Sequence, residues 1–154
     1  MTQRHRIDHE TVHSYQEANY FIQDTKTNED ICIRIGEFNQ AVSNLLARHQ
    51  AITGLIITAW NPHSKVMPKA ENKARNQALE NDALGTDDRV IKYPSYGADD
   101  QQTWQEEGFF FTHIDCQQAQ TLCERYQQNA GVMVDIMHPP QLVWHPSVLL
   151  PDIF

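Results

Sequence analysis

The sequence predicts a single α+β domain, with a mixed β-sheet of about five to seven strands and three main helices. The first observation is the length, because 154 residues suit one ordinary domain with one core. The second is the order of the apolar patterns, which indicates strand, strand, helix, strand, helix, strand, strand, helix and strand, with a final strand toward the C-terminus. A three-layer α/β arrangement is the alternative.

Composition and charge exclude several classes of protein. Hydrophobic residues make up 40% and charged residues 21% of the chain, as in globular proteins, and every apolar run is too short to span a membrane. The net charge of -8, with 12 scattered basic residues, argues against a nucleic-acid partner. The polar N-terminus has the character of neither a secretion signal nor an anchor, and three cysteines, an odd number, predict buried thiols in a reducing compartment. We therefore expect a cytoplasmic protein.

The N-terminal segment is predicted to lie outside the core. Residues 1–14 are expected to form a polar tail, and the globular domain then runs over residues 15–154. On a helix, the four-residue spacing of His5, His9 and His13 would place three imidazoles along one face. No carboxylate or cysteine is placed to complete a closed site with them, so we assign no metal.

The first half of the domain contains a hairpin, a helix and a central strand. Residues 15–22 and 31–35 predict the two strands of the hairpin, because both are rich in aromatic or β-branched residues. Asn39 is a suitable N-cap for the helix that follows. Residues 51–60 are apolar or small on both faces, which is typical of a central strand covered on both sides. Pro62 ends this strand, because proline cannot donate to a ladder.

The loop after the central strand is the first candidate site. Asn61, His63, Ser64 and Lys65 precede a helix that is predicted over residues 68–84. In open sheets, ligands bind beyond the carboxyl ends of central strands, beside a helix N-terminus whose unpaired N–H groups favour negative charge. We therefore expect an anionic metabolite or a nucleotide at this loop.

Asn72 lies in the predicted helix, although asparagine is a mediocre helix former. Either its side chain is solvated, or it turns inward and hydrogen-bonds to the loop. The two alternatives differ in whether this side chain supports the candidate site.

A later strand supplies two carboxylates. Residues 94–103 have the composition of a loop, and a strand is predicted over residues 104–114. This strand begins with Trp104, and its period of two places Glu106 and Glu107 on opposite faces. One of the two therefore borders apolar surface, unless the strand begins after both. Burial would raise the pKa of that carboxyl group and suit it to proton transfer or cation binding.

The last part of the chain adds a helix, a hairpin and an apolar tail. Asp115 and Gln118 have the spacing of a capping box at the start of the helix. Residues 130–136 and 141–144 predict a second hairpin. The tail from residue 148 onward either docks on its own domain or offers a surface for a homo-oligomer, and we favour docking.

Four separated motifs occur in a specific order and spacing. They are Thr58-Ala59-Trp60-Asn61-Pro62-x-Ser64, Glu71-Asn72 with Leu79, Trp104-x-Glu106-Glu107, and Gln128-Asn129-Ala130. Together they resemble the bacterial family catalogued as domain of unknown function 3293, over residues 15–145. Where that family usually has serine after the two glutamates, this chain has Gly108. The resemblance implies a small cytoplasmic bacterial protein and supplies no activity.

Two functions fit these residues. In the first, a pocket at the end of the central strand binds a small molecule. Its expected proton-transfer groups are Glu106, Glu107 and His63, and its expected ligand-binding residues are Asn61, Ser64, Lys65, Asn72, Trp104 and Asn129. In the second, the same residues hold loops in place, and the protein is a non-catalytic interaction or regulatory module. The chain has no phosphate-binding glycine loop, nucleophile elbow or Cys-x-x-Cys motif, so neither a reaction nor a cofactor is assigned.

Overall fold

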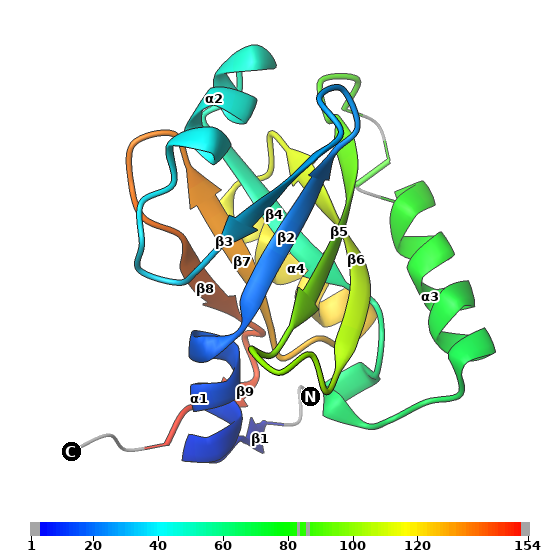
Figure 1. The fold of residues 1–154 in the computed structure, drawn as a ribbon. Helices are drawn as coiled ribbons and strands as arrows, with labels where there is room; N and C mark the ends of the chain where they lie inside the picture. Colours follow the sequence, from blue (N-terminus) through cyan, green and yellow to red (C-terminus); the bar gives the residue numbers. More distant parts are fainter. Residues whose placement is uncertain (1–3, 83, 86, 152–154) are drawn as a thin grey trace.

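The computed structural model describes residues 4–82, 84–85 and 87–151, and their α+β fold confirms the predicted fold class. The main sheet has seven strands in the order β3-β2-β5-β6-β4-β7-β8 (Figure 1). The strands are β2 (Asn19–Asp24), β3 (Glu29–Ile33), β4 (Thr53–Thr58), β5 (Lys92–Ala98), β6 (Gln105–Thr112), β7 (Ala130–Asp135) and β8 (Gln141–Trp144).

Every strand pairing in the main sheet is antiparallel, where the sequence predicts a mixed sheet. The physical reason is that β2–β3, β5–β6 and β7–β8 are consecutive in the chain and pair directly with each other, and consecutive strands joined by short connections run antiparallel. Parallel pairing among the described residues occurs in a small ribbon of β1 (His5–Arg6) and β9 (Val148–Leu149).

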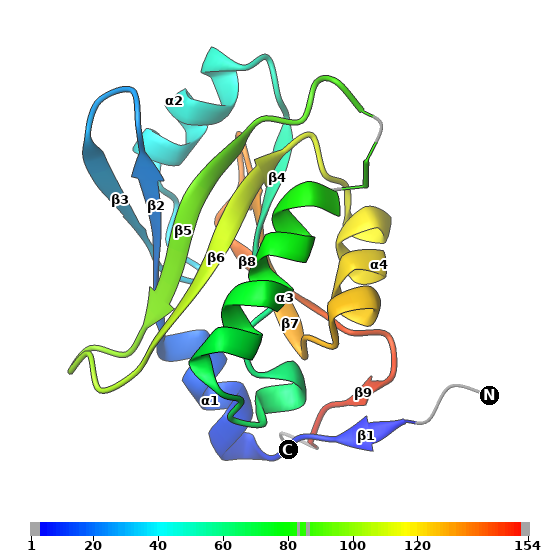
Figure 2. The ribbon, with the colours of Figure 1, turned by 90° about the vertical axis from the view of Figure 1, so that its right-hand side faces the viewer.

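Four α-helices of the described chain surround the sheet, and they are α1 (His9–Glu17), α2 (Gln40–Arg48), α3 (Lys69–Asp82) and α4 (Cys116–Tyr126). Helix α2 covers one face of the sheet, where its Leu45 and Leu46 belong to one buried cluster with Phe110. Helices α3 and α4 cover the other face, where Leu79 and Leu122 belong to a second cluster (Figure 2). Within the described residues, no helix is both long and apolar enough to cross a membrane.

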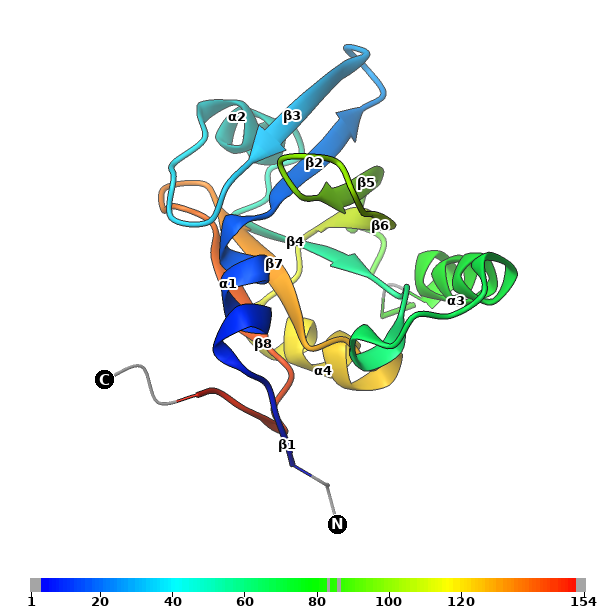
Figure 3. The same ribbon diagram turned by 60° about the horizontal axis from the view of Figure 1, so that its bottom comes forward.

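The main sheet curls, so that its two edge strands approach each other (Figure 3). The N–H of Gly36, just after β3, donates to the carbonyl of Pro140, just before β8, over 2.9 Å. Ile35 and Leu142 from the same two edges pack against the cluster that contains α2. The face toward α2 is therefore concave, and its end next to α1 carries the cavity described below.

Several local predictions are confirmed. The central strand β4 lies between β6 and β7, and its interior residues are buried. The side chain of Asn39 caps α2 by accepting the N–H of Val42 at 3.1 Å. Asp115 and Gln118 form a complete capping box at the start of α4. In each case a local sequence signal coincides with the tertiary environment.

The N-terminal prediction is wrong, because residues 5–17 form β1 and α1 in place of a tail. The side chain of Asp8 caps α1 by accepting the N–H of Thr11 at 2.8 Å. Tyr15 belongs to this helix, so the first strand of the main sheet begins at Asn19. His5 lies in β1, and the predicted helical face with three imidazoles is not formed.

The prediction of a loop over residues 94–103 is also wrong in its first half, because β5 continues to Ala98. Strand β5 pairs with β6 over its whole length, but with β2 only from Ser95 to Ala98. Pro94 therefore lies where one side of the strand has no partner, and this is a position that tolerates proline. Tertiary pairing overrides the turn-like composition of Pro94, Ser95 and Gly97.

The prediction of buried thiols holds for Cys123, whereas Cys32 and Cys116 are exposed. All three cysteines are free. The C-terminal tail docks on its own domain as favoured, because Val148 and Leu149 form β9 against β1. Leu150 is half exposed, and the last two apolar residues of that prediction, Ile153 and Phe154, lie outside the described residues.

Candidate functional site

A cavity with a volume of about 60 Å³ lies on the concave face of the main sheet. Helix α1 and six strands contribute to its walls, and the lining residues include Tyr15, Tyr20, Ser95, Gly97, Trp104 and Glu106. Pockets that enclose a whole drug-sized ligand have volumes of about 300–1,000 Å³. This cavity therefore suits the end group of a small molecule, with the rest of the molecule outside.

Small residues on β5 create the space for the cavity. Gly97 pairs with Glu106 across the β5–β6 ladder, and Ser95, two residues before Gly97, faces the same side of the sheet. A Cβ atom placed on Gly97 would lie 3.5 Å from the ring of Tyr20 and 3.8 Å from the ring of Trp104. The two aromatic rings therefore flank an empty position that most other residues would fill.

Glu106 is the acidic group of the cavity. Its carboxylate is partly buried, and its Oε1 accepts a hydrogen bond from Nδ2 of Asn61 at 3.0 Å. Burial raises the pKa of this carboxyl group, and the hydrogen bond from Asn61 opposes part of that rise. The sequence predicts that one of the two adjacent acids borders apolar surface, and Glu106 is that residue. Glu107 is exposed on the opposite face of β6, away from the cavity.

Asn61 and Asn72 form a closed pair that holds the loop after β4. The N–H of Asn61 donates to Oδ1 of Asn72 at 2.9 Å, and Nδ2 of Asn72 returns a bond to Oδ1 of Asn61 at 2.9 Å. Oδ1 of Asn61 also accepts the N–H of Met67 at 3.0 Å. Asn72 is only 2% exposed, so the inward alternative for its side chain is the one observed. Neither asparagine lines the cavity, and their effect on it is to orient Glu106.

The same loop carries unusual backbone conformations. Asn61, His63 and Ser64 have positive φ angles of 46°, 50° and 64°. Such conformations are costly for residues other than glycine, and they persist where the surrounding structure imposes them. Here the N–H of His63 donates to the carbonyl of Gln127 at 2.7 Å, and Nε2 of Gln128 donates to the carbonyl of Trp60 at 3.0 Å.

The loop lacks the features of the expected anion site. The N–H of Ser64 donates to the carbonyl of Asn61 at 2.8 Å, and the N–H of Lys65 donates to the carbonyl of Pro62 at 3.0 Å, so these donors are already used. Helix α3 begins only at Lys69, after the loop has ended. The side chain of Lys65 is exposed and does not line the cavity. The expectation of an anionic ligand at this loop therefore has no support in the geometry.

Three histidines from separate segments meet beside the loop. The ring centroids of His5 and His63 are 4.5 Å apart, and each lies 5.6 Å from the ring of His145. Oδ1 of Asn129 lies 3.0 Å from Nε2 of His5 and 3.4 Å from Nδ1 of His63. Burial lowers the pKa of His63 and of His145, so both rings favour the neutral form.

This histidine cluster is not arranged as a metal centre. Nδ1 of His145 accepts the N–H of Ser147 at 3.0 Å, so the neutral ring carries its proton on Nε2 and cannot ligate a metal through that atom. Among the described residues, no group of three or more histidine, cysteine, aspartate or glutamate side chains has a metal-binding arrangement. The cluster instead joins β1, the loop after β4 and the segment after β8.

A hydrogen-bond chain links the histidine cluster to the cavity wall. Nδ2 of Asn129 donates to Oγ of Ser64 at 3.2 Å, and Oγ of Ser64 lies 3.4 Å from the hydroxyl of Tyr15. Tyr15 lines the cavity, and its backbone carbonyl accepts the hydroxyl of Tyr20 at 2.7 Å. The predicted residues His63, Ser64 and Asn129 therefore support the wall and do not form it.

The structure thus divides the expected site residues into three groups. Trp104 and Glu106 line the cavity, whereas Lys65 and Glu107 are exposed elsewhere. The other five, Asn61, His63, Ser64, Asn72 and Asn129, hold the surrounding loops by hydrogen bonds.

Sequence reasoning missed Tyr15, Tyr20, Ser95 and Gly97, which all line the cavity. Oγ of Ser95 is the most informative of these groups, because it is buried and has no hydrogen-bond partner among the described residues. The signal for Ser95 and Gly97 is the serine and glycine pattern of β5, whose composition predicts a loop, whereas Tyr15 and Tyr20 reach the cavity only through the fold of α1 and β2.

Comparisons with known proteins define the family without assigning an activity. Residues 57–130 match the family described as "Protein of unknown function (DUF3293)". Neither the comparison with curated proteins nor that with solved structures gave a match. The matched region begins in β4 and ends at the start of β7, so it contains Asn61, Asn72 and Glu106. This match supports membership of the chain in the DUF3293 family.

Proposed function

We propose that this protein binds a small molecule whose end group enters the cavity and is held by Glu106. The observation that carries the proposal is the pair of polar groups in an otherwise largely apolar hollow. Among the described residues, Oγ of Ser95 is buried without a partner, and only the side chain of Asn61 hydrogen-bonds to the carboxylate of Glu106. Buried polar groups are usually satisfied, so both groups have hydrogen-bonding capacity that a ligand can use.

The lining favours a neutral or cationic ligand. Glu106 is the acidic residue among the lining residues, and none of the lining residues is lysine, arginine or histidine. An anion would therefore lose its hydration and meet a carboxylate without a compensating positive charge. A ligand that donates hydrogen bonds would use the acceptor oxygens of both Glu106 and Ser95.

The free thiols support a reducing compartment for this activity. Cys32 and Cys116 are exposed and unpaired, and such cysteines are typical of proteins kept in a reducing environment. We therefore infer a cytoplasmic location, where the ligand would be a metabolite.

A ligand screen by thermal shift tests the proposal, with Gly97→Val as the blocked variant. Gly97 has no positive φ angle, and a Cβ atom there meets only ordinary contacts, so the backbone accepts a side chain at this position, and the two methyl groups of valine extend from it beside the rings of Tyr20 and Trp104. We expect at least one compound to raise the melting temperature of the wild type and not that of Gly97→Val. Gly97→Ala should give an intermediate response.

Two results would contradict this function. Equal stabilisation of the wild type and Gly97→Val would place the ligand outside the cavity. A broad screen without any stabilising compound would favour the alternative of an interaction module, in which the polar residues only hold loops.

A further inference from the structure

We propose that the end group bound in the cavity is an organic ammonium ion, such as a protonated primary amine. This inference rests on the proposed function and deepens it by naming the ligand class. It starts from the aromatic residues of the wall. Tyr15, Tyr20 and Trp104 line the cavity together with the carboxylate of Glu106. A cation close to aromatic faces and a carboxylate is stabilised by both.

The position of Gly97 shows how the aromatic rings are arranged. Its missing Cβ would lie within 4 Å of the rings of both Tyr20 and Trp104, so the two rings border the same space. The hydroxyl of Tyr20 is fixed by its bond to the carbonyl of Tyr15, which holds that ring in place. A cation that enters above Gly97 therefore meets the ring of Tyr20 in a position that is already fixed.

An ammonium group also matches the two acceptor groups of the cavity. Ser95 and Glu106 are diagonal neighbours on one face of the β5–β6 pair, at a spacing of about 7–8 Å between their backbone positions. The free hydroxyl oxygen of Ser95 can accept one N–H, and the carboxylate of Glu106 can accept another. A primary ammonium group carries three donors and no acceptor, so it matches this pair of acceptors.

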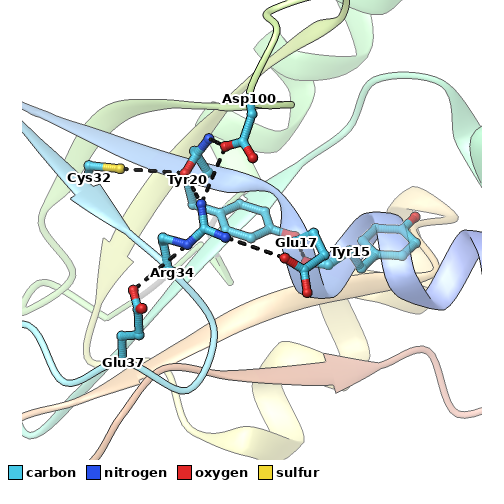
Figure 4. A network of polar contacts seen from close by, with 8 residues as sticks. Tyr15, Glu17, Tyr20, Cys32, Arg34, Glu37 and Asp100 are labelled. Carbon is cyan, nitrogen blue, oxygen red and sulfur yellow. Dashed lines mark hydrogen bonds and ion pairs between the residues drawn. The ribbon is translucent and has the colours of Figure 1, made fainter.

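The electric field outside the cavity favours the same charge. A hollow next to the cavity shares Trp104 with it and is also lined by Glu17, Asp99 and Asp100. Beside this hollow, Arg34 lies between the carboxylates of Glu17, Glu37 and Asp100, so one positive charge faces three negative ones (Figure 4).

These exposed ion pairs contribute little to stability, but their surplus of negative charge attracts cations toward the cavity. The net charge of -8 for the whole chain acts in the same direction. A carboxylate ligand would be repelled along the same approach.

The experiment compares three ligands of equal chain length, n-butylamine, n-butanol and butyrate, at neutral pH and matched ionic strength. Binding is measured by NMR, from the shifts of the Trp104 indole and the Gly97 amide. We expect the amine to bind at least about tenfold more tightly than the alcohol, and butyrate not to bind, because a charged hydrogen bond and the aromatic contacts add to each other.

Glu106→Gln and Glu107→Gln form a matched pair of variants. Both remove one negative charge from adjacent residues of β6, but only Glu106 faces the cavity. The glutamine at position 106 keeps an oxygen that can accept the hydrogen bond from Asn61, so the fold is preserved. We expect Glu106→Gln to weaken amine binding about tenfold or more, and Glu107→Gln to leave it within about twofold.

The outcomes separate this inference from the proposed function. If butanol binds as tightly as butylamine, or if the two variants weaken amine binding equally, the ammonium class is overturned while the cavity remains a binding site. If none of the three ligands shifts Gly97 or Trp104, the ammonium class is also overturned. The proposed function then depends on the wider screen with Gly97→Val.

Discussion

Two buried asparagines on α3 allow a direct test of how the loop beside the cavity is held. Asn72→Ala removes three hydrogen bonds, to the N–H and side chain of Asn61 and to the carbonyl of Met67. Each such bond contributes about 1 kcal/mol to the free energy of unfolding, and the N–H of Asn61 also loses its partner. Alanine returns up to about 0.7 kcal/mol through its better helix propensity. The net loss should be about 2–3 kcal/mol.

Asn76→Ala is the matched control, because Asn76 lies on the same helix, is 8% exposed and has a buried Oδ1 to which no described residue donates a hydrogen bond. This substitution removes no hydrogen bond of the described structure, and we expect a change within about 1 kcal/mol. Urea denaturation followed by circular dichroism measures both variants, and Asn72→Ala should also lower the melting temperature by about 4–12 °C. If Asn72→Ala destabilises the protein no more than Asn76→Ala, the asparagine pair does not hold the loop.

Three further predictions concern packing and pH. Gly108→Ala should lower the free energy of unfolding, measured by urea denaturation, by about 1–3 kcal/mol, because the added Cβ would collide with the backbone of Ile57. Gly97→Ala is the control and should be nearly neutral, because a Cβ there meets only ordinary contacts. Asp24 is buried, and its hydrogen bonds with Arg48 lower its pKa from 3.8 to about 2. This pair therefore contributes up to about 2 kcal/mol to the free energy of unfolding. The contribution is fully present above pH 3.8 and is lost as the pH falls through 2. Acid titration of Asp24→Asn should therefore show a shallower loss of stability than the wild type. The pKa values of His63 and His145 lie below 6.5 in the folded protein, so the unfolded chain binds protons more readily and stability should decrease as the pH falls below 6.5. Melting temperatures measured against pH should show a smaller decrease for His145→Gln than for the wild type.

The sequence is sufficient to predict elements whose local signals agree with their surroundings. The strand that became β4 is apolar on both faces and is buried on both faces, and the caps at Asn39 and Asp115 act through residues only three positions away. The sequence is not sufficient to predict α1, because this short polar helix has no buried residue and therefore no apolar stripe that would identify it. It also cannot show that His5, at the start of the chain, reaches His145 near the end, because that contact depends on the pairing of β1 with β9.

The candidate site was predicted in part for the same reason. Glu106 could be identified as an acid bordering apolar surface, because strand periodicity fixes which way a side chain points relative to its neighbours. The choice between Glu106 and Glu107 needed the fold, because either face of an isolated strand can be the covered one. The role of Asn61 also needed the fold, because its bonds to Asn72 and Glu106 cross 11 and 45 residues of sequence.

The error at β5 points to the site more directly than the successes do. Pro94, Ser95 and Gly97 are unfavourable in a strand, and a sequence optimised only for stability would place larger apolar residues on this concave face. The strand forms nevertheless, because β2 and β6 pair with it on both sides from Ser95 to Ala98. The small residues then leave the cavity open, and the hydroxyl of Ser95 is buried in it without a partner in the described part of the chain. These local sequence choices weaken the strand and at the same time create an unfilled polar hollow, and the proposed function accounts for both by a ligand that fills the hollow.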